Sequence, residues 1–148
     1  MKKILFVCTG NTCRSPMAEA IFNAKTGETF EAKSAGIFAA QGSSASPQAI
    51  QVLKEKDIDF SHSSRILDRD LLEWADVILT MTSGHKQVIK QQYPNVAEKV
   101  HVLQQFVDID SDLVDISDPY GGSVSIYRQT SGEIESAINK LIVQLTKS

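Results

Sequence analysis

The chain has 148 residues, 42% of them hydrophobic, which is enough to bury one substantial core and too little for a second full domain. Its net charge is −3 with no basic tract, which argues against a nucleic-acid partner, because binding a phosphate backbone requires concentrated positive charge. No segment approaches the ~18 consecutive apolar residues of a membrane span, so we expect one cytoplasmic domain over residues 1–148 without a membrane partner.

The first predicted elements are a strand, a loop and a helix. The apolar run over residues 3–7 predicts a buried strand. A helix is predicted from Pro16 to about residue 26, with Ser15 as its N-cap and Gly27 after its last residue. The connecting loop reads Cys8-Thr9-Gly10-Asn11-Thr12-Cys13-Arg14-Ser15.

This loop has the composition of an anion-binding site that carries its own nucleophile. Gly10 permits a close backbone approach and Asn11 tolerates the left-handed conformation, so successive N–H groups converge on a tetrahedral oxyanion. Arg14, six positions after Cys8, can grip two oxygens of such an anion. The positive end of the following helix and Arg14 both favour the thiolate of Cys8, a competent nucleophile toward phosphorus. Taken alone, a cysteine in an apolar strand is usually a buried hydrophobe.

The rest of the chain alternates strands with helices. Strands are predicted at 29–35, 76–81 and 99–103, and helices at 47–56, 69–74, 84–93 and 123–146, with Ser46 and Asp68 as N-caps. Short apolar strands separated by helices imply a doubly wound α/β fold, a parallel sheet with helices on both faces. Ligands bind such sheets beyond the strand C-termini, which is where the loop after the first strand lies.

Asp118-Pro119 lies in the loop between the fourth predicted strand and the last helix, at the same edge of the sheet as the cysteine loop. Pro119 stiffens the backbone behind a carboxyl group that could deliver a proton, although Asp-Pro is also an ordinary turn sequence. The aspartates that precede it are expected to be solvated rather than to bind a metal; they are Asp108, Asp110, Asp112 and Asp115.

The cysteines and histidines do not have the spacing of a metal site, so we expect no metal and no cofactor. His85 is expected on the surface of a helix, and His101 is expected to be structural. Because a reactive thiolate oxidises readily, we hypothesise that peroxide joins Cys8 and Cys13 in a reversible disulfide, which intact-mass analysis after oxidation would detect.

The run from Val7 to Ala20, together with Asp118-Pro119-Tyr120, resembles the low-molecular-weight protein tyrosine phosphatases over essentially the whole chain. The resemblance implies four strands in the order 2-1-3-4. It implies that Cys8 forms a phosphocysteine, Arg14 binds the phosphoryl group, and Asp118 protonates the leaving group and then activates water. It also implies a phosphate-binding and supporting set, with Ser15 steadying the thiolate: Thr9, Gly10, Asn11, Thr12, Cys13, Ser15, Ser34 and His62.

Two departures from the tyrosine-specific pattern bear on the substrate. Thr12 replaces a bulky aliphatic residue, as in the bacterial branch of the family that dephosphorylates phosphoarginine in proteins. Gly121-Gly122 follows Tyr120 where tyrosine-specific members often have a second aromatic residue. A narrower, more polar slot suits a guanidinium better than a phenyl ring, with Phe38 as a candidate apolar wall. The alternative is that Thr12 merely fills the loop and the substrate is phosphotyrosine.

Two further classes of protein fit the sequence less well. Arsenate reductases share a similar loop, but their thiol relay needs cysteines beyond the nucleophile, and this chain has none after Cys13. A non-catalytic phosphate-binding module would leave both the thiol and the Asp-Pro pair unexplained. We therefore expect a monomeric protein phosphatase whose partners are phosphorylated proteins.

Overall fold

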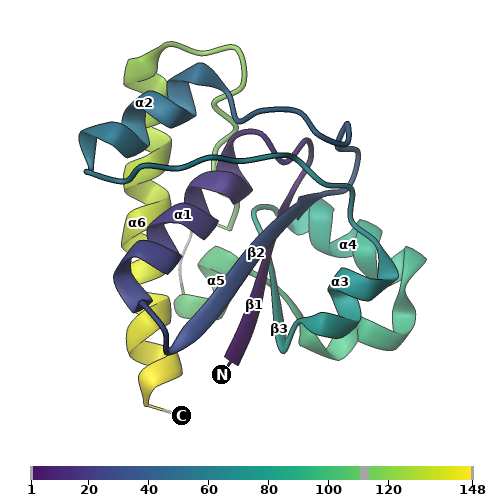
Figure 1. Cartoon of the computed structure of the whole chain (residues 1–148). Helices are drawn as coiled ribbons and strands as arrows, with labels where there is room; N and C mark the ends of the chain where they lie inside the picture. Colours follow the sequence, from purple (N-terminus) through teal and green to yellow (C-terminus); the bar gives the residue numbers. More distant parts are fainter. Residues whose placement is uncertain (1, 111–113, 148) are drawn as a thin grey trace.

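The structure, a computed structural model, describes residues 2–110 and 114–147 (Figure 1). Four parallel strands form one sheet in the order β2-β1-β3-β4. The expected α/β class and strand order are therefore confirmed. The strands are β1 (Lys2–Cys8), β2 (Phe30–Gly36), β3 (Val77–Thr80) and β4 (Val100–Val102).

Helices cover both faces of the sheet, as predicted (Figure 1). One face carries α1 (Arg14–Thr26), α2 (Pro47–Glu55), α5 (Leu103–Val107) and α6 (Val124–Thr146); the other carries α3 (Arg69–Trp74) and α4 (Ser83–Gln92), with the 3₁₀ helix η1 (Pro94–Lys99) after α4. None of the helices that the structure describes combines the length and apolarity that crossing a bilayer requires.

The central strand β1 positions the cysteine loop. It has a strand on each side and helices on both faces, so its residues 4–8 are all buried. Side chains alternate along a strand, and Ile4, Phe6 and Cys8 pack on the α1 and α6 side while Leu5 and Val7 pack on the α3 and α4 side. Cys8 is the last residue of β1, at the edge of the sheet where ligands bind.

Local capping explains where several helices begin. The Ser46 hydroxyl accepts a hydrogen bond from the Ala49 N–H at 3.3 Å. The Asp68 carboxylate accepts one from the Leu71 N–H at 2.8 Å. Both predicted N-caps are thus confirmed, because the bonds that cap a helix involve residues close in sequence.

Two predictions of local structure were wrong, those for Ser15 and Leu103. Ser15 is not an N-cap: α1 begins at Arg14, and the Ser15 hydroxyl bonds to groups of the cysteine loop instead. Leu103 does not extend β4 but starts α5, in which it is buried. On α6, Ile126 is 48% exposed, and the buried stripe begins with Tyr127. Tyr127 lies three residues before the buried Thr130, on the same helix face.

Candidate active site

The cysteine loop connects β1 to α1, and a left-handed residue lets it turn. Asn11 has φ of 56°, a conformation that asparagine tolerates better than most residues. Its backbone N–H donates to Cys8 Sγ at 3.2 Å, so the loop curls back over the sulfur. The loop therefore wraps around Cys8, as predicted, with Asn11 as its left-handed residue. The close approach expected at Gly10 is not found, because a Cβ there would meet only Thr12 Oγ1, at 3.7 Å.

Cys8 is a free thiol, 3% exposed, with a second hydrogen-bonding partner in Ser15. The two side-chain atoms, Sγ and Oγ, lie 2.9 Å apart. Asn11 Nδ2 donates to Ser15 Oγ at 2.9 Å, so the Ser15 proton can be donated to sulfur, which is nearer than its other acceptor, Ala35 O at 3.5 Å. Donation by a hydroxyl and an amide stabilises negative charge on Sγ, so the geometry suits a nucleophilic thiolate.

Asn11 is the centre of the network that supports the loop. Its Nδ2 also donates to Ser34 Oγ at 2.9 Å, and its carbonyl oxygen lies 2.7 Å from His62 Nε2. The structure thus brings Asn11, Ser15, Ser34 and His62 together around the loop. The Asn11 side chain is fully buried, and both polar atoms of its amide form hydrogen bonds. Nδ2 donates to Ser15 and Ser34, and Oδ1 accepts from the Arg65 N–H at 2.9 Å.

Two members of this network were not expected from the sequence. The Ser34 hydroxyl accepts from Asn11 and donates to Glu19 Oε1 at 2.6 Å. A carboxylate among the apolar residues 16–22 of α1 was the available signal for Glu19. Arg65 contributes only its backbone N–H, which no side-chain pattern could have indicated.

Gly36, at the end of β2, is the position where the cysteine loop leaves no room for a side chain. A Cβ there would lie 2.6 Å from Thr9 O and 2.8 Å from Asn11 N. Both neighbours are backbone atoms, so the clash with a side chain could be relieved only by moving the backbone of the loop or of β2.

Substituting Gly36 by alanine is therefore expected to lower kcat/KM about 100-fold, because shifts near 1 Å in a catalytic group cost about that much. The measurement is steady-state hydrolysis of p-nitrophenyl phosphate. Gly132→Ala is the matched control, since a Cβ on this α6 residue meets nothing within 4 Å. Equal activity in the two variants would show that the loop tolerates displacement.

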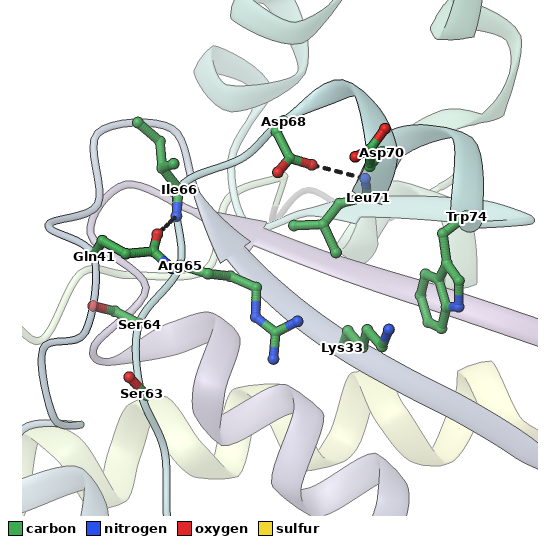
Figure 2. A pocket seen from close by; sticks show the side chains of 10 residues that line it. All are labelled: Lys33, Gln41, Ser63, Ser64, Arg65, Ile66, Asp68, Asp70, Leu71 and Trp74. Atoms are coloured by element: carbon green, nitrogen blue, oxygen red, sulfur yellow. Dashed lines mark hydrogen bonds between the residues drawn. The ribbon is translucent and has the colours of Figure 1, made fainter.

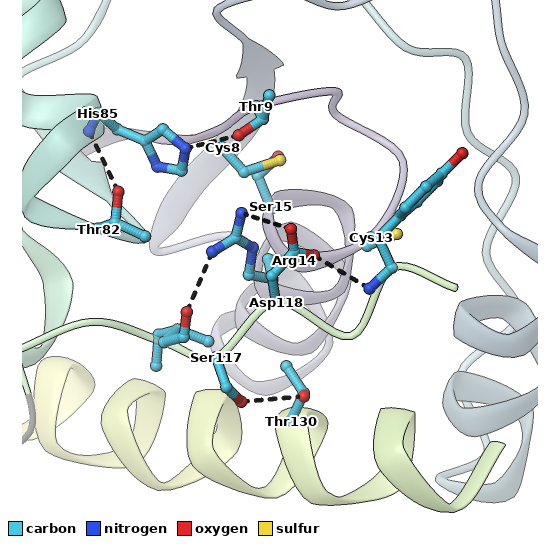
Figure 3. Close-up of polar contacts among 12 residues, drawn as sticks. Cys8, Thr9, Cys13, Arg14, Ser15, Thr82, His85, Ser117, Asp118 and Thr130 are labelled. Carbon is cyan, nitrogen blue, oxygen red and sulfur yellow. Dashed lines mark hydrogen bonds and ion pairs between the residues drawn. The ribbon is translucent and has the colours of Figure 1, made fainter. Parts of the chain in front are cut away.

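Arg14 and Asp118 meet across the mouth of the loop (Figure 3). Arg14 is 5% exposed, and its Nη1 donates to Ile116 O at 3.0 Å. Its Nη2 lies 3.7 Å from Asp118 Oδ2, and Asp118 Oδ1 accepts from the Tyr120 N–H at 3.0 Å. Arg14 is thus anchored by one nitrogen, and Asp118 is held beside the other with its side chain 57% exposed.

These groups border one cavity of about 220 Å³. It is lined by Cys8, Thr9, Gly10, Thr12, Cys13, Arg14, Asp118 and Tyr120. The expected Phe38 wall is not among the lining residues. Phe38 is 74% exposed, although its backbone N–H donates to Thr9 O at 2.9 Å.

Cys13 is also a free thiol, 6% exposed, and its closest polar partner comes from α6. Its Sγ lies 3.2 Å from the hydroxyl oxygen of Tyr127, a tyrosine that is 1% exposed. Burial, followed by the hydrogen bond with Cys13, raises the pKa of Tyr127 to about 12. Tyr127 was missed as a neighbour of the site, although its spacing from Thr130 placed it on the buried face.

His85 is buried rather than on the surface, which corrects the expectation from sequence. Its Nε2 lies 2.8 Å from Thr9 Oγ1, beside the nucleophile (Figure 3). Burial lowers the pKa of His85 to about 4; the Arg14 guanidinium acts in the same direction, and Asp115 and Asp118 oppose it. His85 is therefore neutral at pH 7.

This lowered pKa predicts a pH-dependent stability. Below its ordinary pKa of 6.5, His85 takes up a proton when the chain unfolds, and the folded protein resists protonation until about pH 4. The free energy of unfolding should therefore fall as the pH drops from 6.5 to about 4, and His85 accounts for at most about 3 kcal/mol of this fall. Urea denaturation of the native protein and of His85→Gln across the window measures it. Parallel pH profiles would contradict the assignment.

The acidic loop before Asp118 is partly described. Asp115 Oδ1 accepts from the Ser83 N–H at 2.8 Å, and Asp108 lies 3.6 Å from Lys140 Nζ. Asp110 is exposed, and Asp112 lies outside the described residues.

Comparison with known proteins places this geometry in a family. The family described as low molecular weight phosphotyrosine protein phosphatase matches residues 3–148. A protein-arginine-phosphatase of Geobacillus stearothermophilus is 48% identical, over 97% of this chain and 95% of the relative. The solved YwlE arginine phosphatase of the same organism superposes with a TM-score of 0.95 at 46% identity, over 99% of this chain and 94% of the other.

A second solved structure concerns the state of the active-site residue. It is a YwlE arginine phosphatase mutant with a phosphorylated active-site serine, which matches with a TM-score of 0.93 and 43% identity over 99% of this chain and 97% of the other. The match of the family over nearly the full length, with a loop that wraps a buried cysteine, leads to one conclusion. This chain belongs to the low molecular weight phosphotyrosine protein phosphatase family.

Proposed function

We propose that this chain removes the phosphoryl group from phosphoarginine in proteins, by way of a phosphocysteine on Cys8. It is a cysteine-dependent protein phosphatase. The observation that carries the proposal is the single cavity in which Cys8, Arg14 and Asp118 meet with Thr12 on its wall. The arginine-phosphatase relatives support the same substrate.

The first step transfers the phosphoryl group to sulfur. The Cys8 thiolate attacks phosphorus while Arg14 Nη2 and the loop amides hold the phosphoryl oxygens. A sulfur–phosphorus bond forms and the phosphorus–nitrogen bond breaks, its electron pair going to nitrogen. Asp118, beside Arg14 Nη2, donates the proton that this nitrogen takes up, so that arginine leaves.

The second step hydrolyses the phosphocysteine and regenerates the Cys8 thiolate. Asp118, now a carboxylate, accepts a proton from water as the water oxygen attacks phosphorus. The sulfur–phosphorus bond breaks, and the departing thiolate is stabilised by the Ser15 hydroxyl and the Asn11 N–H. Inorganic phosphate is released, and Asp118 carries the proton needed for the next turnover.

Thr12 is the residue that we assign to substrate choice. It is half-buried on the cavity wall, where its hydroxyl can bond to a guanidinium N–H. Tyr120 is the one aromatic side chain among the residues lining the cavity, and Gly121-Gly122 follow it. The second candidate substrate is phosphotyrosine, which the description of the family favours.

The test is kcat/KM on phosphoarginine, phosphotyrosine and phosphoserine in one peptide context. We expect phosphoarginine to be preferred, and Thr12→Ile to shift the ratio of phosphoarginine to phosphotyrosine at least about tenfold toward tyrosine, because a hydrogen-bonding site discriminates against partners that cannot reciprocate. Thr29→Ile, an exposed position outside the cavity lining, is the matched control. A native preference for phosphotyrosine would overturn the substrate, and an unchanged ratio would remove Thr12 from the account.

The phosphatase works as one domain over residues 1–148, as a monomer in the cytoplasm, without metal or cofactor, because Arg14 and the loop amides already meet the phosphoryl charge. Phosphorylated proteins are its partners, with no nucleic acid or membrane. Cys8 and Cys13 are the two cysteines that peroxide joins in a reversible disulfide.

A further inference from the structure

A second cleft lies on the outer side of β2, apart from the catalytic cavity (Figure 2). Its volume is about 520 Å³, and it shares no lining residue with that cavity. Residues 63–66 form one wall, α3 with Trp74 forms another, and Lys33 of β2 lies at its base.

Two cations point into the cleft without an anionic partner. Arg65 is half-buried, and within residues 2–110 and 114–147 its guanidinium has neither a hydrogen bond nor an ion pair. Lys33 is half-buried as well, with Nζ 4.5 Å from the Trp74 ring centroid and no ion pair within the same residues. Figure 2 shows the Arg65 guanidinium directed toward Lys33 and Trp74.

The carboxylates of the cleft lie on its other side. Asp68 and Asp70 belong to the start of α3, and Asp68 Oδ1 already accepts from the Leu71 N–H. Neither carboxylate forms an ion pair with Arg65 or Lys33 among the described residues. The two positive groups of the cleft, Lys33 of β2 and Arg65 of the wall formed by residues 63–66, are thus left without a carboxylate partner among the described residues.

A guanidinium carries five N–H donors, and those of Arg65 have no acceptor from the protein within the described residues, so they are available to a ligand. An anion with several oxygens, held between a guanidinium fork and an ammonium, would satisfy them. We propose that this cleft is a second anion-binding site, which takes the phosphate group of free phosphate or of a small phosphate ester through Arg65 and Lys33.

The cleft wall is joined to the catalytic loop, so binding there has a route to the site. The Arg65 N–H donates to Asn11 Oδ1, and Gly36 N–H donates to Arg65 O at 3.0 Å. His62, three residues earlier, contacts Asn11 O. An anion bound to Arg65 would hold residues 62–65 in place, and this segment contacts Asn11. The Asn11 N–H in turn donates to the sulfur of Cys8.

The chain offers a clean probe, because Trp74 is its only tryptophan and lies in the cleft. In ¹H–¹⁵N spectra its indole N–H gives one peak, while the amides of residues 9–14 report on the catalytic cavity. Inorganic phosphate and methylphosphonate, a stable stand-in for an ester, are titrated at constant ionic strength, with acetate as a comparison. Arg65→Gln removes the guanidinium, and Arg69→Gln is the control, an exposed arginine of α3 outside the cleft lining.

We expect the indole peak to titrate with phosphate, and the apparent Kd to rise about tenfold or more in Arg65→Gln but not in Arg69→Gln. The catalytic-loop amides should titrate in all three proteins. A matching response to methylphosphonate supports an ester ligand, and a response to phosphate alone supports free phosphate. The proposal is overturned if the indole peak stays still, if acetate moves it equally, or if both variants behave as the native protein.

Discussion

Cys8→Ser is expected to abolish turnover, lowering kcat by about 10⁴-fold or more, as when other enzymes lose their nucleophile. The substitution exchanges sulfur for oxygen at the end of β1, and a hydroxyl is a far weaker nucleophile toward phosphorus than a thiolate. The hydrogen bonds from Asn11 N–H and the Ser15 hydroxyl would then be directed at a neutral, weakly nucleophilic oxygen. Steady-state hydrolysis of p-nitrophenyl phosphate and of a phosphoarginine peptide measures the loss.

Phosphate binding distinguishes this result from unfolding. Serine is nearly isosteric with cysteine, and Arg14 with the loop amides remains in place to hold a phosphate ion. We therefore expect Cys8→Ser to bind inorganic phosphate within a few-fold of the native affinity, by titration of the catalytic-loop amides. Substantial hydrolysis by a variant that binds phosphate normally would mean that another group attacks phosphorus.

Asp118→Ala is expected to lower kcat/KM on phosphoarginine by about 10²–10⁴-fold, the usual range for loss of a general acid. This carboxyl lies 3.7 Å from Arg14 Nη2, with its other oxygen held by the Tyr120 N–H. Cleavage of the phosphorus–nitrogen bond needs a proton on the departing nitrogen, and no other carboxyl lines the cavity among the described residues.

A second substrate makes the assignment specific. p-Nitrophenolate leaves without needing a proton, so kcat/KM on p-nitrophenyl phosphate should fall much less than on phosphoarginine. Asp59→Ala, an exposed aspartate outside the cavity lining, controls for the lost charge. Equal losses on both substrates would contradict a role in protonating the leaving group and would favour a structural role for Asp118.

Sequence reasoning succeeded where the determining interactions are local. The caps at Ser46 and Asp68 involve backbone groups three residues away, and the apolar runs of the strands determine which segments are buried. The cysteine loop was recognisable because Asn11 meets a conformational need within a few residues of Cys8, with φ of 56°. Gly10 does not meet the need expected of it, since it is outside the left-handed region and a Cβ there would meet only Thr12 Oγ1, at 3.7 Å.

Contacts between distant segments could not be read in this way. His85 was expected at the surface, but the packing of α4 brings its ring to Thr9, 76 positions earlier. Ser15 has the residue type of a cap, yet its hydroxyl bonds to Asn11 and Cys8 once the loop folds back. Phe38 follows β2 at the correct edge of the sheet, but only the fold decides that its side chain is exposed.

The most direct test of a phosphocysteine on Cys8 is to trap it. The native protein is mixed with excess phosphoarginine peptide, quenched rapidly in denaturant, and analysed by intact mass and peptide mapping. One PO₃ unit per chain should appear on the peptide that contains Cys8 during turnover, and it should be absent from that position in native protein mixed with unphosphorylated peptide. Full product release without any phosphoryl group on Cys8 would contradict covalent transfer and point to direct attack by water.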